Sequence, residues 1–204
     1  MKRIYKSVIA FFISILCVFN SSVTYAFDRK DDYIKEYKDN IYNMAKIMRC
    51  IPKTGDLNLD YLYEMDFLSE GEVSFSKAYI KYSTADEVKD MAQKYIERES
   101  AAIENIRTII EKLKDAPDVD KSEEEKYLNI YNEVLNGMMC RFQKVELTED
   151  INADFLKFIL IHHNGVIELT EEFCNMSSNP EVKEVAYKIL NEMKSDLIVI
   201  NKYI

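Results

Sequence analysis

An internal repeat constrains the fold of this chain more than any other feature of its sequence. When the sequence is aligned with itself at an offset of 94 residues, identical residues fall opposite one another without a gap. A gapless register of this length is hard to obtain by chance, so the sequence predicts a tandem repeat of one structural unit. The matching positions are Asn58 and Asn152, Asp60 and Asp154, Leu62 and Leu156, Gly71 and Gly165, Ser83 and Ser177, 87–89 and 181–183, Ala92 and Ala186, Lys94 and Lys188, and Ile106 and Ile200.

Each unit is predicted to contain three helices. Apolar residues recur at steps of three and four in both halves, which is the period of an amphipathic helix. Only four glycines and three prolines occur in 204 residues, which leaves little room for the turns of hairpins or barrels. The first apolar stripe runs from Tyr33 to Met48. The later helices are expected to begin at potential capping residues, which are Asn58, Thr84, Ser122, Asn152 and Ser178.

The repeat also predicts how the helices assemble. The segment 116–118 is the expected joint, so the units are 27–115 and 116–204. In each unit the second and third helices are long enough to form an antiparallel hairpin. Two such hairpins, related by an approximate twofold axis, would bury each other's apolar stripes as a ferritin-like four-helix bundle. We therefore expect an all-α protein in which both repeats form one bundle domain, with one extra helix of each repeat outside it.

The first 26 residues are expected to be a secretory signal and not part of the fold. Lys2, Arg3 and Lys6 form a basic start, an apolar run follows, and Ala26 is the small residue at which cleavage is expected. Removal of 1–26 changes the formal net charge from −9 to −12, since no acid is lost. The expected mature protein is secreted or extracytoplasmic, repels nucleic acid and does not insert stably in a membrane.

Three cysteines remain after the expected cleavage, and their spacing indicates no metal site. Cys50, Cys140 and Cys174 contain no Cys-x-x-Cys pair, so a zinc ribbon or a thioredoxin-type site is not predicted. An odd number leaves at least one thiol outside any internal bridge. We expect these to be ordinary buried cysteines.

The only two histidines, His162 and His163, lie in the middle of the second repeat's long apolar stripe. The stripe places His162 toward the core and His163 about 100° round the helix on its flank. A buried imidazole must be hydrogen-bonded or bound to a metal. In the first repeat the equivalent residues are Leu68 and Ser69, so any imidazole site belongs to one half only.

The repeat also suggests which side chains face the histidines. Met65 lies one turn before their counterparts, and Glu99 and Met193 occupy matching places on the two closing helices, with Asp196 one turn further on. Imidazole and thioether ligands together suit copper, especially the reduced ion. A nearby carboxylate would allow such a site to bind zinc as well. In the alternative interpretation the methionines fill gaps in the core and the histidines are structural.

In the segment around the histidines, the chain resembles the domain-of-unknown-function 305 family (DUF305). The resemblance rests on Phe155-Leu156, the histidine pair, Gly165, Ile167, the acid at 168, the helix start at 180–182 and Ala186. It implies an exported, helical, ferritin-like protein, and some members of the family bind copper through methionine and histidine. The chain departs from the family pattern at Ile159 and Leu169, where methionine is typical, and at Met193 and Asp196, where glutamine and glutamate are common.

Other functional classes are less well supported. No Glu-x-x-His occurs, which argues against a ferritin-like di-iron enzyme. No nucleophile motif or phosphate loop occurs either, so we do not expect an enzyme. The leading hypothesis is extracytoplasmic metal binding, with copper first and zinc second, for storage, buffering or transfer. The alternative is a ligand-free secreted interaction module, which the fourteen tyrosines favour. The protein partner is undetermined, and a homodimer stays open.

Overall fold

The chain folds into helices, as the sequence predicts. The computed structural model describes residues 30–148 and 150–203, and within these ranges it contains six helices and no strand. The signal predicted for 1–26 lies outside the described residues. The helices cover residues 30–48, α2 (Leu57–Tyr82), α3 (Asp86–Leu113), α4 (Lys121–Gln143), α5 (Ile151–Met176) and α6 (Pro180–Ile200).

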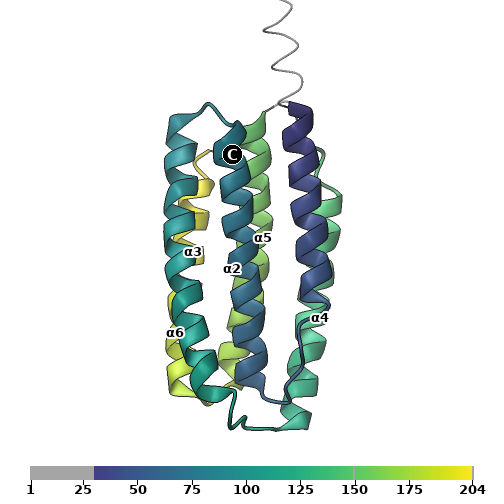
Figure 1. Ribbon diagram of the computed structural model, residues 1–204, viewed down its shortest axis with the longest axis vertical. Coiled ribbons are helices and arrows are strands. Elements are labelled where there is room, and N and C mark those ends of the chain that lie inside the picture. Colours follow the sequence, from purple (N-terminus) through teal and green to yellow (C-terminus); the bar gives the residue numbers. More distant parts are fainter. Residues whose placement is uncertain (1–29, 149, 204) are drawn as a thin grey trace, which may run out of the picture.

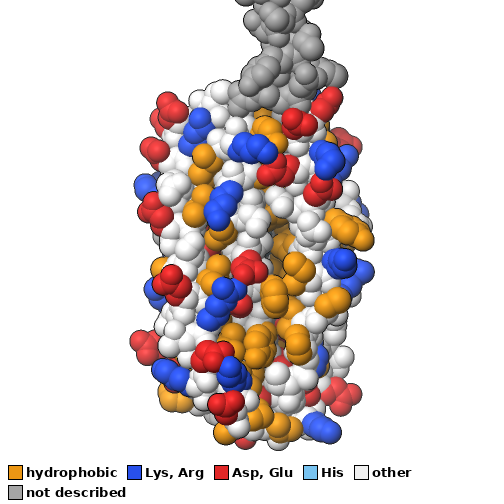
Figure 2. Space-filling view, in the orientation of Figure 1, with side chains coloured by type: hydrophobic (Ala, Val, Ile, Leu, Met, Phe, Trp, Pro, Cys, Tyr) orange, Lys and Arg blue, Asp and Glu red, His pale blue; other side chains and the backbone are white. Residues whose placement is uncertain are grey.

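The helices form three side-by-side pairs along the long axis of the molecule (Figure 1). The pair of α2 and α5 lies in the centre, α3 and α6 lie on one side, and α4 and the 30–48 helix lie on the other. In this order α2 packs against α3 and α5, and α5 packs against α4 and α6. Along the described chain, no helix is both long and apolar enough to cross a bilayer. Figure 2 shows hydrophobic side chains gathered between α2 and the 30–48 helix, with both signs of charge scattered around them.

Stacked aromatic rings join the central pair of helices. Tyr79 stacks on Phe155 with ring centroids 4.1 Å apart, and Phe75 stacks on Phe158 at 3.4 Å. At the other end of the pair Tyr61 stacks on Phe173 at 3.8 Å. As the residue number falls along α2, the number of the stacked partner on α5 rises, so α2 and α5 are antiparallel. Rings of this size supply much of the apolar burial of a core and fix the register of the two helices.

Several contacts recur 94 residues apart. Ser83 Oγ donates a hydrogen bond to Asn152 Oδ1 at 2.8 Å, and Ser177 Oγ donates one to Asn58 Oδ1 at 2.6 Å. These two bonds tie opposite ends of α2 and α5 together. The self-alignment matches Asn58 with Asn152 and Ser83 with Ser177. The two hydrogen bonds are therefore the same contact, made once at each end of the helix pair.

The two mid-helix glycines also occupy equivalent surroundings. A Cβ on Gly71 would lie 2.9 Å from Met44 Sδ, and a Cβ on Gly165 would lie 2.8 Å from Met138 Sδ. Met44 and Met138 are themselves 94 residues apart, one on each outer helix. Glycine at these positions costs about 1 kcal/mol relative to alanine in helix propensity, and it leaves room for the methionine side chains. Methionine side chains of the outer helices, and not a neighbouring backbone, therefore make the close approach at both glycines.

The predicted helix starts differ from the observed ones by one or two residues. Asp56, Asp120 and Asp150 cap α2, α4 and α5, each two residues before the residue expected there. A carboxylate accepts hydrogen bonds from the free N–H groups of the first turn and is further stabilised by the helix dipole. Ala85 and Asn179, the caps of α3 and α6, lie one residue after the expected positions.

The cysteines differ from the expectation as well. Cys174 is buried, but Cys50 and Cys140 are exposed, and all three are free thiols. Cys50 follows the 30–48 helix and Cys140 lies near the end of α4, where the outer helices face solvent on one side. A position on an outer helix therefore explains the exposure of both.

The buried carboxylate of Glu64 makes the stability of the fold depend on pH. Glu64 is fully buried on α2, where Lys53 Nζ donates to it at 2.6 Å and the Tyr127 hydroxyl donates to its other oxygen. Burial raises the pKa of Glu64 to about 7, although the Lys53 ammonium opposes the shift. The folded protein therefore keeps this proton to a higher pH than the unfolded chain does.

We expect Glu64→Gln to remove part of the pH dependence of stability. Between the ordinary glutamate pKa of 4.5 and about 7, the unfolded chain releases this proton while the folded chain retains it. The free energy of unfolding therefore falls as pH rises through this window, by about 3 kcal/mol from this group, and is flat above it. Urea titrations at several pH values measure the difference between wild type and variant. The same substitution at exposed Glu133 is the control, and equal slopes in all three proteins would contradict the assignment.

Candidate metal centre

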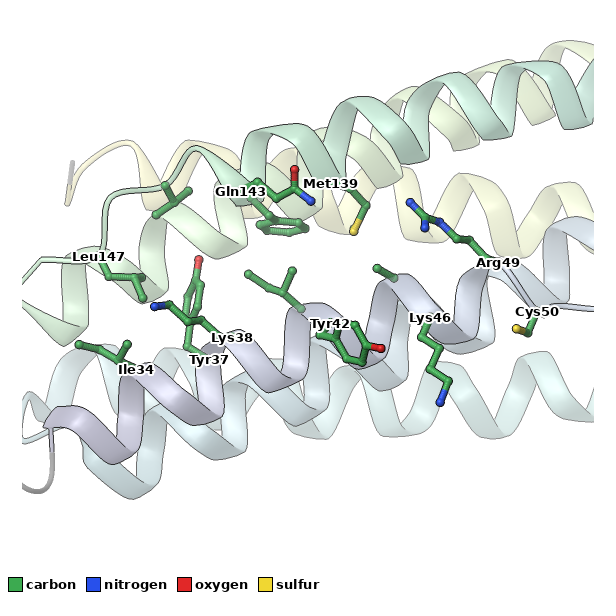
Figure 3. A pocket seen from close by; sticks show the side chains of 14 residues that line it. Ile34, Tyr37, Lys38, Tyr42, Lys46, Arg49, Cys50, Met139, Gln143 and Leu147 are labelled. Carbon is green, nitrogen blue, oxygen red and sulfur yellow. The ribbon is translucent and has the colours of Figure 1, made fainter.

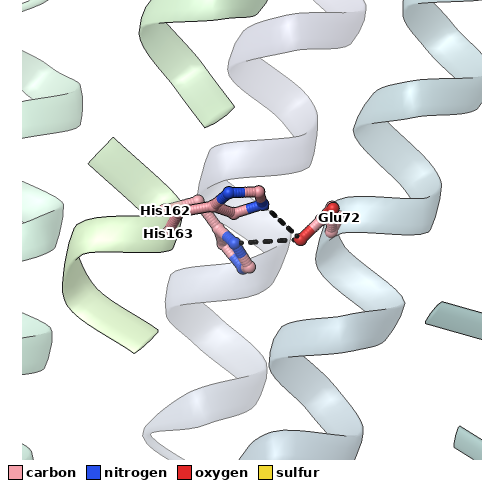
Figure 4. A group of neighbouring side chains, drawn as sticks. All are labelled: Glu72, His162 and His163. Atoms are coloured by element: carbon pink, nitrogen blue, oxygen red, sulfur yellow. Dashed lines mark hydrogen bonds and ion pairs between the residues drawn. The ribbon is translucent and has the colours of Figure 1, made fainter. Parts of the chain in front are cut away.

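Three buried side chains meet halfway along the central helix pair. Glu72 comes from α2, and His162 and His163 come from α5 (Figure 4). One potential ligand atom from each residue lies within 4.8 Å of the other two. The exposed fractions are 0% for Glu72, 1% for His162 and 0% for His163. This cluster is a candidate metal centre, because two imidazoles and a carboxylate are common metal ligands.

The hydrogen bond of His162 fixes which of its nitrogens can bind a cation. Its Nε2 lies 3.2 Å from the backbone oxygen of Leu68. A carbonyl oxygen only accepts, so Nε2 must carry the hydrogen. In the neutral ring Nδ1 then carries a lone pair, and this atom lies 3.3 Å from Glu72 Oε2 without a hydrogen bond. With a neutral ring, two electron-rich atoms would therefore face each other inside the core.

His163 completes the cluster from the next position of the helix. Its Nε2 lies 3.2 Å from the same oxygen of Glu72. Its Nδ1 is buried without a hydrogen bond, and the nearest carboxylate is Oδ2 of Asp196, on α6, at 3.8 Å. The ring packs edge-on against Tyr95 of α3, with centroids 5.6 Å apart. His163 is therefore held between two carboxylates, one on each ring nitrogen.

Arg98 of α3 neutralises the acids around the histidines. Its guanidinium lies 3.4 Å from Glu72 Oε1, 2.9 Å from Glu99 Oε1 and 2.5 Å from Asp196 Oδ2. Ser69 Oγ also donates to Glu99, at 2.8 Å. The arginine therefore joins acids from three helices, α2, α3 and α6. With side chains 20% and 17% exposed, Arg98 and Asp196 separate the buried cluster from solvent.

The acids of this network differ in charge. Burial would raise the pKa of Glu72, but the attraction of the two imidazoles, which acts when the rings are protonated, outweighs it and lowers that pKa. Burial, together with repulsion from Glu72, raises the pKa of Glu99 to about 7. Burial also raises the pKa of Asp196, against the attraction of Arg98. The carboxylate oxygen nearest the two histidines is Glu72 Oε2, at 3.3 and 3.2 Å, whereas Asp196 Oδ2 lies 3.8 Å from His163.

We expect Arg98→Met to destabilise the protein by about 2 kcal/mol at pH 7.5. The variant keeps the apolar stem but leaves buried carboxylates without their cation, which is costly because their desolvation is no longer offset. The double variant Arg98→Met/Glu99→Gln should regain part of the loss. Arg107→Met is the matched control, because Arg107 pairs with Asp66 and its side chain is 51% exposed. A loss for Arg98→Met no larger than the control's, in urea denaturation, would contradict this role.

The structure brings some of the sequence-predicted site residues together and separates others. His162 and His163 lie in the cluster, and Glu99 lies in the surrounding network. Met65 Sδ instead accepts a hydrogen bond from Thr170 Oγ1 at 4.0 Å. Thr170 is seven residues beyond His163, about 10 Å along the helix. Met193 is buried on α6, one turn before Asp196.

Glu72 was not predicted as a site residue, although the sequence carries a signal for it. The apolar stripe of α2 passes through Leu68, Phe75 and Tyr79, and Glu72 lies on the same stripe. A charged residue on such a stripe must be paired or bound to a metal. In addition, α2 and α5 are antiparallel, so a residue earlier in α5 faces a residue later in α2. The partner of the histidines is thus one turn after Leu68, not one turn before it.

The spacing of the cluster fits a small metal ion. At metal–ligand distances of 2.0 to 2.2 Å, a tetrahedral ion holds its ligands roughly 3.3 to 3.6 Å apart. The distances from Glu72 Oε2 to the two imidazole nitrogens, 3.3 and 3.2 Å, are close to this range. Uncharged N–H···O bonds are commonly shorter, near 2.9 Å. Two nitrogens and one oxygen are donors that suit zinc or oxidised copper, and all three lie within 4.8 Å of one another.

Comparison with known proteins gives one match. The model of a family described as "Domain of unknown function (DUF305)" matches residues 59–203. The matched range contains Glu72, both histidines, Arg98 and Asp196. No curated protein and no solved structure was found to match the chain.

Proposed function

Since the chain belongs to the DUF305 family, we propose that it is an extracytoplasmic protein that binds one metal ion between α2 and α5, for storage, buffering or transfer. The ligands are Nδ1 of His162, Nε2 of His163 and the carboxylate of Glu72. Oxidised copper is the first candidate and zinc the second, because sites with nitrogen and oxygen ligands bind divalent copper more tightly than zinc. Reduced copper fits less well, because Met65 lies away from the cluster.

The contact between His162 Nδ1 and Glu72 Oε2 carries this proposal. Both atoms are buried, they lie 3.3 Å apart, and no hydrogen bond joins them. A neutral ring that donates through Nε2 places a lone pair against an ionised oxygen, which is repulsive in a medium of low dielectric constant. A cation between the two atoms removes the repulsion. Protonation of the ring would also do so, and metal titration separates the two explanations.

The groups behind the ligands also support a metal site. Imidazoles that bind metals usually donate their second N–H to a carbonyl or a carboxylate, which orients the ring and raises its basicity. The Leu68 carbonyl takes this role for His162, and Asp196 is positioned to take it for His163. Arg98 in turn holds Asp196. Each ligand therefore has a second partner on another helix.

The proposed architecture accounts for a single site per chain. We infer a duplicated hairpin, in which α2, α3, α5 and α6 form a ferritin-like four-helix core and the two outer helices cover one side. The contacts that recur 94 residues apart support this arrangement. The positions equivalent to His162, His163 and Glu72 are Leu68, Ser69 and Val166. The single site therefore combines two histidines of the second half with Glu72 of the first half, and the equivalent residues, which are apolar or small, form no second site.

Two features favour a protein that binds and carries a metal ion over one that catalyses a reaction at it. The ligand side chains are at most 1% exposed, which leaves no access for an organic substrate. The basic start and apolar run of residues 1–26 favour export, and an exported protein meets metal ions outside the cytoplasm. Storage, buffering or transfer needs a bound ion but no reaction at the site.

Titration of the chelator-treated protein with Cu(II), Zn(II) and Cu(I) tests the proposal. We expect one equivalent of Cu(II) to bind, Zn(II) to bind more weakly and to be displaced by Cu(II), and Cu(I) to bind least. The thermal midpoint should rise with each divalent ion, because the ion binds the folded state alone. Uptake of neither divalent ion, with no change in the thermal midpoint, would overturn the proposal and favour protonated structural histidines.

A further inference from the structure

A groove lies on the side of the molecule away from α3 and α6. It runs between the 30–48 helix and α4, and its volume is about 930 Å³ (Figure 3). Ile34 lines one end and Cys50 the other, so the groove follows the 30–48 helix for about 24 Å. Apolar side chains form much of its lining. They are Ile34, Ile41 and Ala45 of the 30–48 helix, Met139 and Phe142 of α4, and Leu147 of the segment that follows α4.

The charged residues of this groove are all cations. Lys38, Lys46 and Arg49 line it, and no aspartate or glutamate does. The chain as a whole has 36 acidic and 27 basic residues. A lining with three basic residues and no acidic one is therefore more positive than the rest of the chain. Within the described ranges, none of the three forms an ion pair. The groove therefore combines an apolar surface with unneutralised positive charge, which complements an amphipathic anion.

A buried hydroxyl provides a second observation. Tyr37 is only 2% exposed, its ring packs edge-on against Phe75 and Phe158, and its hydroxyl has no hydrogen-bond partner. The hydroxyl points from the 30–48 helix toward the α4 side of the groove (Figure 3). A buried hydroxyl without a partner costs stability, because it has lost its hydrogen bonds to water. An acceptor oxygen on a ligand in the groove would remove that cost.

The size of the groove separates two kinds of occupant. An α-helix about 10 Å wide needs roughly 1,900 Å³ over 24 Å, twice the space present. Small-molecule sites commonly measure about 300 to 1,000 Å³, and they combine an apolar lining with a few polar groups. The observed volume lies in this range. A single acyl chain with an anionic head therefore fits better than a partner helix.

We propose that the groove binds a long-chain carboxylate, that is, a free fatty acid. The carboxylate accepts the Tyr37 hydroxyl and pairs with Lys38, and the acyl chain lies along Ile41, Ala45 and Phe142. This site is separate from the metal centre, which lies on the other side of Phe158: Phe158 stacks on Phe142 at 4.9 Å and on His162 at 5.7 Å. Fatty acid binding therefore does not depend on the proposed metal function.

Displacement of a fluorescent fatty acid tests this site. The purified protein, free of metal, is mixed with dansyl-undecanoate, and dodecanoate or dodecanol is added as competitor below its micellar concentration. We expect dodecanoate to displace the probe at least tenfold more effectively than dodecanol, and this preference to shrink as salt is raised. Tyr37→Phe and Lys38→Glu should each weaken dodecanoate binding by roughly threefold to tenfold. Ala45→Trp, which fills the groove, should weaken both competitors.

The controls distinguish the groove from general binding. Lys188→Glu makes the same charge change on the exposed face of α6 and should leave the affinity for dodecanoate unchanged. Glu72→Gln, at the metal centre, should also leave it unchanged. The proposal is overturned if dodecanoate fails to displace the probe. It is also overturned if Lys38→Glu and Lys188→Glu weaken binding equally, or if Ala45→Trp, folded by circular dichroism, binds both competitors as the wild type does.

Discussion

Replacing both histidines, in His162→Ala/His163→Ala, is expected to lower the affinity for Cu(II) by at least about a thousandfold, or about 4 kcal/mol. Removing one group behind a metal ligand typically costs about 10 to 100-fold, so removing two ligands outright costs more. Glu72 remains, but a single carboxylate in a buried site cannot offset the desolvation of a divalent ion. Competition against a chelator of known affinity measures the change.

The double variant needs a control for the fold. Both rings are buried, and His162 stacks on Phe158, so two alanines leave a cavity and lower stability. Asn164→Ala removes an exposed side chain from the adjacent position of α5 and should bind copper as the wild type does. Circular dichroism must show that both variants are helical at the temperature of the titration. Undiminished copper affinity in a folded double variant would place the metal elsewhere.

The second large effect is expected for Glu72→Gln, which should weaken Cu(II) binding by about a hundredfold while leaving the metal-free protein nearly as stable as the wild type. The two effects have different causes. The ion loses its only charged ligand. The metal-free protein loses a carboxylate, but Arg98 keeps Glu99 and Asp196 as partners. The new amide can also donate to the lone pair on His162 Nδ1, which the carboxylate cannot do.

This pair of results separates a metal centre from a structural ion pair. If the cluster exists to stabilise the fold through protonated histidines, removing the charge of Glu72 should cost several kcal/mol in the metal-free protein, because buried cations are left uncompensated. We expect a change of less than about 1 kcal/mol, measured by urea denaturation in the presence of a chelator. A large loss of stability together with unchanged copper affinity would contradict the metal assignment.

Much of the fold could be predicted from periodicity and from the repeat. The all-helical fold is confirmed, and so is the family. Helix starts were less predictable, because aspartates two residues upstream compete with the asparagine or serine that the pattern favours. Both kinds of residue can accept from the first turn, and only the folded backbone decides which one does.

The candidate site could be predicted only in part. The histidines stood out because they interrupt an apolar stripe and occur nowhere else in the chain. Glu72 interrupts its own stripe in the same way, yet glutamate is so common in this chain that one more attracts no notice. Which residue faces the histidines depends on the register between α2 and α5. That register is fixed by stacked rings such as Phe75 on Phe158, which sequence separation alone does not reveal.

Met65 illustrates the same difficulty from the other side. It was a candidate ligand because it lies one turn before Leu68 and Ser69, the counterparts of the histidines in the first repeat. In the folded chain its sulfur accepts from Thr170, two turns away from the histidines. The apolar groove could not be predicted at all, because it depends on the spacing between two outer helices that are distant in sequence.

X-ray absorption spectroscopy of the zinc-loaded protein is the sharpest test of the proposed metal centre, because it reports the atoms around the ion itself. We expect a shell of nitrogen and oxygen at about 2.0 to 2.1 Å, with the outer-shell scattering of two imidazoles and no sulfur. The imidazole scattering should disappear in His162→Ala/His163→Ala. A sulfur shell near 2.3 Å, or a first shell without imidazole, would show that the ion is held by other residues than His162, His163 and Glu72.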